Sequence, residues 1–375
     1  MFLRFLILSI GNISQFIRGV LVAENGPIEE LAKIVSSKIF ERFKWKISGP
    51  FDQDFACIDE DNHKPIDKKQ AHTHPVDVVF SYKDPYLNKT ILLNTDLKSY
   101  AKGSINVDMI EGALSSLGET ISCARYSSQW REKYNICAGD SEVRGLLFVY
   151  NHDNDFEHNF YNFFDPPPPK GRGKRPKSIK LDNINISEGQ QLHIIEPKTI
   201  SYMLSIIADM NELVRDNQFP REEYGFYYPQ LVYHKVVVTD DYFPATVESL
   251  TAPFLIIKHD AVYSFNRETQ KEFECYPPGY IVYYNRPGSS DMEFYYLLDL
   301  LSNYQILNGK NNIRIRIATS DRNDSIRSHF QRALEKYALD WNYDESAKQK
   351  LLAMELHLVP TVKEFYSSEA MSWER

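Results

Sequence analysis

Two short apolar runs, separated by seven residues rich in turn formers, constrain the fold of this chain most strongly. The first run covers Val76–Tyr82 and the second covers Thr90–Thr95. Runs of this length that are rich in Val, Ile, Leu and aromatic residues are typical of β-strands, and the Asp, Pro and Asn of Lys83–Lys89 favour a turn. The pattern therefore predicts a β-hairpin.

Charged residues lie at the ends of both runs. Asp77 opens the first run, and Asp96-Leu97-Lys98 follows the second. Residues two apart on a strand point to the same face, so Asp96 and Lys98 share a side while Leu97 faces the opposite layer. If Asp77 lies on the neighbouring strand, two carboxylates and one ammonium converge, which is costly in a purely structural sheet. A divalent cation would remove that cost, and a lysine beside it can orient or deprotonate water, as in a metal-dependent phosphodiesterase.

These residues resemble the signature of the PD-(D/E)XK, or restriction-endonuclease-like, nuclease superfamily. Pro75-Val76-Asp77 stands for the first half of the motif and Asp96-Leu97-Lys98 for the second, although the proline and the first acid are not adjacent here. The resemblance implies that Asp77 and Asp96 bind Mg²⁺ or Mn²⁺, with the Leu97 carbonyl as a further ligand. It also implies that Lys98 assists the attacking water, and that the α/β core is a mixed central sheet flanked by helices.

A helix is predicted before the motif, over Ile28–Phe43. Apolar residues recur there at helical spacing, and Pro27 suits the first turn. Glu29 and Glu30 both lie in that turn, and the resemblance implies that one of them completes the site. Glu30 fits the spacing of resolvase-like members better, whereas Glu29 lies closer to the apolar stripe. Alternatively, both complement the helix dipole only.

Periodicity after the motif predicts the rest of a nuclease domain over residues 1–225. The expected elements are a helix over Val107–Tyr134, strands over Val143–Asn151 and Leu192–Ile195, and a helix over Ile200–Val214. This order is close to the core topology of the superfamily, with one of its usual strands not placed.

A stiff, basic loop interrupts this domain at residues 165–180. Four prolines follow Asp165, and the basic residues after them are Lys170, Arg172, Lys174, Arg175, Lys177 and Lys180. Prolines impose an extended conformation, and a cluster of cations attracts a phosphate backbone without reading its sequence. We expect the first five of these cations to contact nucleic acid, the alternative being a solvated loop with no partner.

Residues 226–375 predict a second α/β domain, or an elaboration of the first sheet, with an interaction or nucleic-acid-binding role. Expected strands are Phe254–Lys258, Tyr280–Tyr284 and Ile313–Ala318, and expected helices are Met292–Leu307 and Ser325–Tyr337. Aromatic residues here either fill a core or stack on bases. Arg314 and Arg316 share one strand face and point either to solvent or to phosphate.

The composition narrows the class of protein. A hydrophobic content of 43% in 375 residues predicts a folded globular chain, and a net charge of −8 excludes a uniform coat on nucleic acid but not a local basic groove. Cys57, Cys123, Cys137 and Cys275 show no zinc-finger spacing, so we expect reduced thiols and no structural zinc. The apolar N-terminal stretch is too short and too interrupted for a membrane span, and we expect a cytoplasmic protein.

The sequence leaves two rival hypotheses. His72, His74 and Asp77 could bind zinc in a hydrolase, with His152 as the nearest further candidate. A nuclease-like fold could also act as a non-catalytic scaffold or nucleic-acid-binding subunit. The favoured hypothesis is a metal-dependent nuclease acting on DNA, with RNA not excluded, which serves as a defence effector. Because an unregulated nuclease would endanger its host, we expect a homodimer or a regulatory partner protein.

Overall fold

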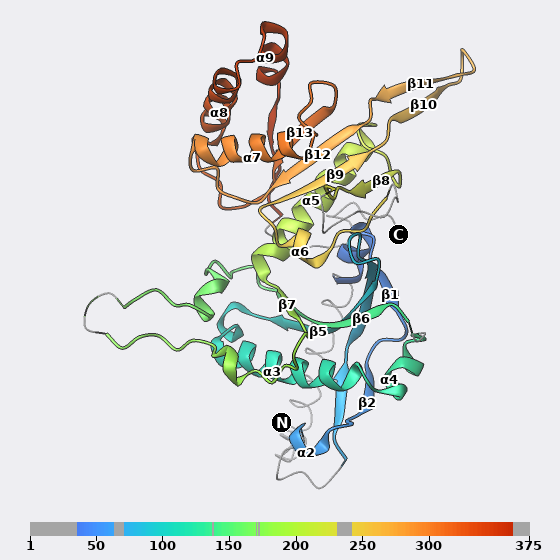
Figure 1. Cartoon of the computed structure of the whole chain (residues 1–375), viewed down its shortest axis with the longest axis vertical. Coiled ribbons are helices and arrows are strands. Elements are labelled where there is room, and N and C mark those ends of the chain that lie inside the picture. Colours follow the sequence, from blue (N-terminus) through green and yellow to red (C-terminus); the bar gives the residue numbers. More distant parts are fainter. Residues whose placement is uncertain are drawn as a thin grey trace, which may run out of the picture.

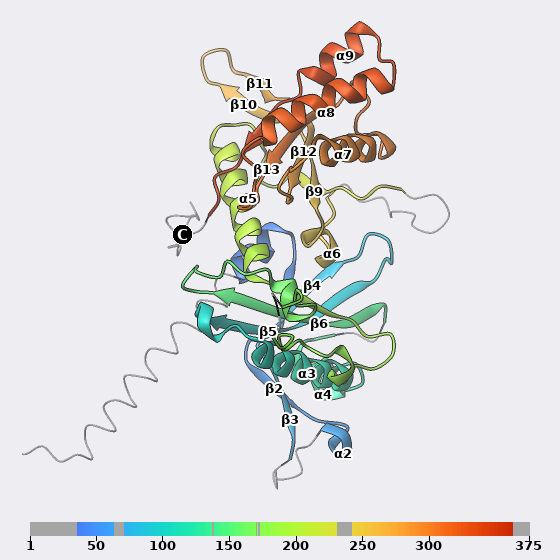
Figure 2. The same ribbon diagram turned by 90° about the vertical axis from the view of Figure 1, so that its left-hand side faces the viewer.

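The structure, a computed structural model, describes residues 36–63, 71–136, 139–169, 171, 173–230 and 242–362. Two β-sheets follow one another along the long axis of the molecule, and helix α5 (Pro197–Arg215) runs from one to the other (Figures 1 and 2). The first sheet is mixed and flanked by helices, and the second is an additional C-terminal sheet. The predicted α/β fold class is confirmed.

The first sheet contains the predicted hairpin. Its strand order is β1-β4-β5-β6-β7, with β1 at Lys46–Ser48, β4 at Val78–Lys83, β5 at Thr90–Tyr100, β6 at Ser141–Asn151 and β7 at Leu192–Ile195. β4 is antiparallel to both β1 and β5, whereas β5, β6 and β7 are parallel. β1 was not predicted from the sequence, because three residues are too few to show a hydrophobic period.

The first apolar run is divided at Asp77. β3 (Thr73–Val76) pairs with β2 (Gln53–Ala56) in a separate two-stranded ribbon, and β4 begins only at Val78. The Asp77 carbonyl accepts a hydrogen bond from the backbone N–H of Asp52 at 2.9 Å. The single strand predicted over Val76–Tyr82 is therefore wrong at its start, and Asp77 lies where the chain passes from the ribbon into the central sheet.

Helices cover both faces of the first sheet. On one face, α3 (Val107–Ala124) buries Leu114 and Leu117 in a core cluster with Leu147 and Val149 of β6. The opposite face packs against α5 and residues 36–42, which are helical; residues 28–35 of the predicted helix lie outside the described residues.

The single helix predicted over Val107–Tyr134 is wrong. It divides into α3 and α4 (Ser128–Lys133), because the Ser127 hydroxyl accepts a hydrogen bond from the Trp130 N–H and so begins a new helix.

The second sheet has the strand order β14-β13-β12-β9-β8. Its strands are β8 (Tyr224–Phe226), β9 (Phe254–His259), β12 (Gly279–Tyr284), β13 (Asn312–Ile317) and β14 (Leu356–Leu358). Helices α7 (Asp291–Asn303), α8 (Ile326–Asp340) and α9 (Glu345–Leu352) lie beside it. The predicted strands and helices of this region are present, whereas α9 and the protruding hairpin β10 (Val262–Asn266) and β11 (Lys271–Tyr276) were not predicted. The shorter elements are α2 (Glu60–His63), α6 (Val247–Leu250), and 3₁₀ turns at Lys102–Ser104, Phe160–Phe163 and Leu181–Asn183.

Arg314 and Arg316 point neither to solvent nor to an open phosphate site. Arg316 donates two hydrogen bonds of 2.5 Å to the Asp209 carboxylate on α5. Arg314 is buried, and its guanidinium lies 3.0 Å from His259 Nε2. The Arg face of β13 thus packs toward α5, and the ion pair compensates for its burial.

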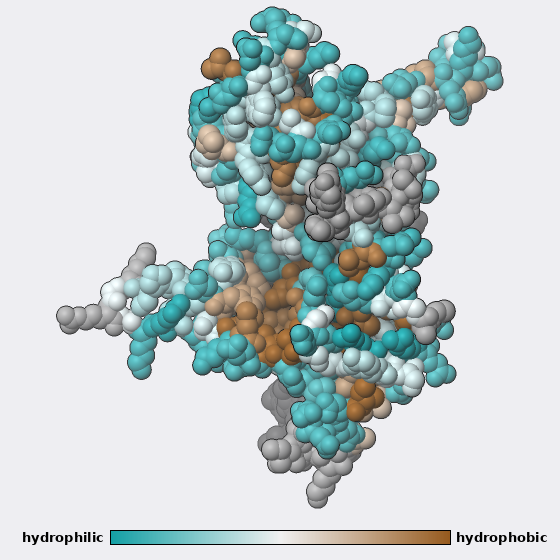
Figure 3. All heavy atoms as spheres, viewed as in Figure 1, coloured by the Kyte–Doolittle hydropathy of each residue, from teal (hydrophilic) through white to brown (hydrophobic). Residues whose placement is uncertain are grey.

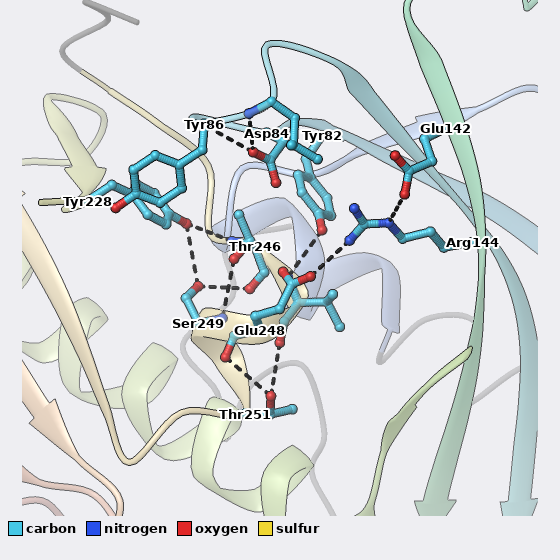
Figure 4. Close-up of polar contacts among 12 residues, drawn as sticks. Tyr82, Asp84, Tyr86, Glu142, Arg144, Tyr228, Thr246, Glu248, Ser249 and Thr251 are labelled. Carbon is cyan, nitrogen blue, oxygen red and sulfur yellow. Dashed lines mark hydrogen bonds and ion pairs between the residues drawn. The ribbon is translucent and has the colours of Figure 1, made fainter. Parts of the chain in front are cut away.

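Polar contacts beside α6 connect the first sheet to the region that contains the second sheet (Figure 4). Arg144 of β6, whose side chain is only 4% exposed, donates to Glu142 and to Glu248 of α6, both at 2.8 Å. Nearby, the Tyr228 hydroxyl accepts a hydrogen bond from the Thr246 N–H at 2.7 Å. One core cluster also contains side chains from both sheets. The region after residue 225 is therefore packed directly against the first sheet.

Candidate active site

Asp77 and Asp96 meet across the hairpin. The β4–β5 register pairs Val78 with Thr95, so extending it by one residue brings Asp77 opposite Asp96. Asp77 Oδ2 accepts a 2.6 Å hydrogen bond from the Leu97 N–H, which holds the first carboxylate against the second strand. Leu97 itself packs into the opposite layer, as predicted. The two acids thus lie on the α3 side of the sheet.

The Asp77 carboxyl group is electrostatically strained. Burial raises its pKa, the charge of Asp96 raises it further, and the Leu97 N–H and Lys98 oppose the change, so that the pKa reaches about 6. Asp52 adds another nearby negative charge. The site therefore has an excess of negative charge in a partly desolvated place, which is the condition that a bound cation relieves.

Lys98 lies on the same face and is ion-paired with Asp96. Its Nζ lies 2.6 Å from Asp96 Oδ1, and the two side chains are 30% and 19% exposed. Burial lowers the pKa of Lys98, but the charges of Asp96 and Asp77 outweigh that effect, so the net direction is upward. Lys98 is therefore an ammonium ion at neutral pH, suited to attract phosphate oxygens and to orient water.

Two neighbours of this site, Asp52 and Tyr134, were missed by sequence reasoning. Asp52 lies in the turn before β2 and adopts a positive φ of 54°. The Tyr134 hydroxyl is buried and has no hydrogen-bond partner among the residues that the structure describes. Burial and the charges of Asp77 and Asp52 raise its pKa. Neither residue belongs to the hairpin pattern, and only tertiary packing brings them close to Asp77.

Only some of the remaining predicted site residues lie within the described part of the chain. Glu29 and Glu30 lie outside the described residues, as do Lys170 and Arg172 of the loop. Of the other loop cations, Lys174 is exposed, Arg175 lies 3.4 Å from Asp165, and Lys177 forms an ion pair with Asp108 of α3. Both pairs are exposed and leave these cations accessible to an external anion. The loop extends away from the body of the molecule (Figure 1).

The proposed zinc group of His72, His74 and Asp77 does not form within the described part of the chain. His74 lies instead in a group with Cys57, His63 and Cys123, whose potential ligand atoms are all within 4.8 Å of one another. The Asp77 carboxylate points to Leu97. His74 lies within β3, whereas Asp77 follows the end of that strand and contacts β5, so the histidine and the acid have different surroundings.

Two of the four cysteines lie next to each other, and Cys137 lies outside the described residues. Cys57 and Cys123 are free thiols, as expected, but they are not isolated, since their sulfur atoms are 3.7 Å apart.

His152, the further zinc candidate, contacts Ser99, with 3.3 Å between His152 Nδ1 and the Ser99 hydroxyl.

Residues 22–199 match the family described as the GAPS4 protein PD-(D/E)XK nuclease domain. This segment is a PD-(D/E)XK nuclease domain. The matched PD-(D/E)XK segment contains the whole first sheet together with Asp77, Asp96 and Lys98, and it ends in the first turn of α5. The resemblance inferred from the motif is thereby confirmed.

No match was found among curated proteins, and none among solved structures. Within the residues that the structure covers, no helix has the length and apolar character needed to cross a membrane.

Proposed function

We propose that this chain is a metal-dependent nuclease that hydrolyses phosphodiester bonds of DNA. The observation that supports this most is the convergence of Asp77, Asp96 and Lys98 on one face of a hairpin, inside a PD-(D/E)XK domain. Two adjacent carboxylates, one of which has its pKa raised to about 6, would only destabilise a sheet whose role is purely structural.

The residues fit a divalent cation. Each acid uses one oxygen internally, Asp77 for the Leu97 N–H and Asp96 for Lys98. The second oxygen of each carboxylate accepts no hydrogen bond within the described ranges and is available as a ligand. Mg²⁺ or Mn²⁺ bound by these two acids, with the Leu97 carbonyl, would supply Lewis-acid stabilisation of the charge that develops on the phosphate. We propose that Glu29 or Glu30 completes this set.

Lys98 has the role of a charged positioning group. Its ammonium is held by Asp96 and its pKa lies above the ordinary value, so it carries a proton when substrate arrives. An ammonium in this position donates hydrogen bonds to a phosphate oxygen and to the attacking water. Asp77, which is ionised above a pH of about 6, supplies the compensating negative charge.

DNA would be guided by the loop at residues 165–180. Lys170, Arg172, Lys174, Arg175 and Lys177 form a cationic segment on an acidic protein, and the loop protrudes from the body that contains the site (Figure 1). Contacts of this kind hold the phosphate backbone without selecting a sequence.

A second copy or a regulatory protein would restrain the enzyme. The matched family is that of a GAPS4 protein, a class named for anti-phage defence, and we propose that this chain is a defence effector. β7 is an edge strand of the first sheet, and hydrophobic residues gather over it and α3 on the face in Figure 3. Edges and apolar patches of this kind are suitable contact surfaces for another chain.

The test is a panel of linear, circular and single-stranded DNA and of RNA, each incubated with Mg²⁺, Mn²⁺ or EDTA. Wild type is compared with Lys98→Ala and with Lys102→Ala, a matched control whose ion pair with Asp155 is exposed. We expect metal-dependent cleavage of DNA that is lost in Lys98→Ala and kept in Lys102→Ala. Retardation of DNA without metal and without cleavage would instead support a binding subunit.

A further inference from the structure

Four side chains that the nuclease chemistry does not use converge at the end of the molecule farthest from the second sheet. They are Cys57, just after β2; His63, at the end of α2; His74, in β3; and Cys123, near the end of α3. Figures 1 and 2 show α2 and the β2–β3 ribbon at this end, next to α3. Four separate elements therefore each contribute one thiol or imidazole to a single point.

Three of the distances among these atoms match a tetrahedral ligand cage, and all four atoms lie within 4.8 Å of one another. Zinc binds sulfur at about 2.3 Å and histidine nitrogen at about 2.0–2.1 Å, so tetrahedral angles put two sulfurs about 3.8 Å apart and a sulfur about 3.6 Å from a nitrogen. Here the two sulfurs are 3.7 Å apart, and His63 Nδ1 lies 3.5 Å from Cys57 Sγ and 3.4 Å from Cys123 Sγ. A disulfide would need sulfurs at about 2.05 Å.

The surroundings fit a closed metal site. His74 is 2% exposed, and its Nε2 is buried without a hydrogen-bond partner among the described residues, a costly state for a ring nitrogen. Cys57 Sγ accepts a hydrogen bond from the Asp59 N–H at 3.4 Å, which holds the sulfur in place. Two thiolates and two neutral imidazoles are donors that zinc prefers to Mg²⁺ or Ca²⁺.

We propose that Cys57, His63, His74 and Cys123 bind one structural zinc ion. Four protein ligands fill the tetrahedron and leave no position for substrate, which distinguishes this site from a catalytic zinc. The ion would hold α2 and the β2–β3 ribbon against the end of α3. His74 lies three residues before Asp77 on the same segment, so the zinc would also fix the strand that delivers Asp77 to the proposed active site.

The first test measures metal in the full-length wild-type protein after growth with added zinc and removal of loose metal by gel filtration. Elemental analysis should find about one zinc per chain, and X-ray absorption should find two sulfur and two nitrogen ligands at the distances above. A folded wild-type protein that contains no zinc, or one in which mass spectrometry finds a Cys57–Cys123 disulfide, would overturn the proposal.

The second test uses matched variants. Cys123→Ser should reduce the zinc content to about a tenth or less, because three ligands bind far more weakly than four. Cys275→Ser, which removes a partly buried thiol from β11, should keep the full content. If Cys123→Ser fails to fold, release of zinc from wild type by a mercurial reagent, followed with a chromogenic chelator, gives the same answer. Retention of zinc by folded Cys123→Ser, or absence of released zinc, would contradict the assignment.

Discussion

Replacing Asp77 by asparagine should stabilise the metal-free protein while it removes a proposed metal ligand. A carboxyl group whose pKa rises on folding binds its proton more tightly in the folded state. Its burial therefore begins to cost stability near the ordinary pKa of 3.8, and the cost is complete above about 6. At ~1.4 kcal/mol per pH unit, this amounts to about 3 kcal/mol at pH 7.5 and about 1 kcal/mol at pH 4.5.

Asparagine removes the charge and keeps an oxygen that can accept the Leu97 N–H. In urea denaturation with EDTA, Asp77→Asn should therefore be more stable than wild type by up to about 3 kcal/mol at pH 7.5, and this advantage should shrink to about 1 kcal/mol at pH 4.5. Asp155→Asn, which alters an exposed acid, should show no such dependence on pH. A variant less stable than wild type at pH 7.5, or an advantage independent of pH, would refute the assigned electrostatics.

Three further predictions concern the site, the loop and the core. Because protons and metal compete for Asp77, Mn²⁺ affinity measured by electron paramagnetic resonance should fall as the pH drops below about 6; constant affinity down to pH 5 would argue against Asp77 as a ligand. Replacing Lys174 and Arg175 by alanine should weaken DNA binding equally for all sequences and reduce the slope of log K against log salt by about 2, and an unchanged slope would remove the loop from the interface. Arg316→Met should destabilise the protein by about 3–5 kcal/mol in urea because it leaves the buried Asp209 without its cationic partner, with only the Tyr283 hydroxyl still donating to it; a loss below about 1 kcal/mol would mean that this pair does not hold α5 to the second sheet.

The hairpin and most flanking elements could be predicted because each depends on a local repeat. Short apolar runs and turn formers mark β4 and β5, and apolar residues at helical spacing mark α3 and α5. The pairing of Asp77 with Asp96 follows from the same register. The break between α3 and α4 depends on one capping hydroxyl, that of Ser127. Because the apolar stripe continues past this residue, periodicity alone predicts a single helix.

Features made by distant segments could not be predicted in this way. Cys57 and Cys123 are 66 residues apart, and no spacing rule connects them until α3 packs beside the β2–β3 ribbon. Arg314 and Arg316 alternate with isoleucine as on a solvent-exposed face, yet α5 covers that face and supplies Asp209. In both cases the contacting residue lies on a helix whose position in space cannot be derived from the hydrophobic pattern of the sequence.

Asp77 and Asp96, which face each other across the hairpin, are proposed to form the centre that cuts DNA. The most direct measurement is single-turnover cleavage of DNA in Mg²⁺ by Asp96→Asn beside Asp155→Asn, with both variants shown to be folded. We expect Asp96→Asn to lose at least about 100-fold in rate, since the loss of a metal ligand removes charge stabilisation of the transition state, and Asp155→Asn to match wild type. Cleavage by Asp96→Asn at the wild-type rate would place the chemistry elsewhere in the molecule.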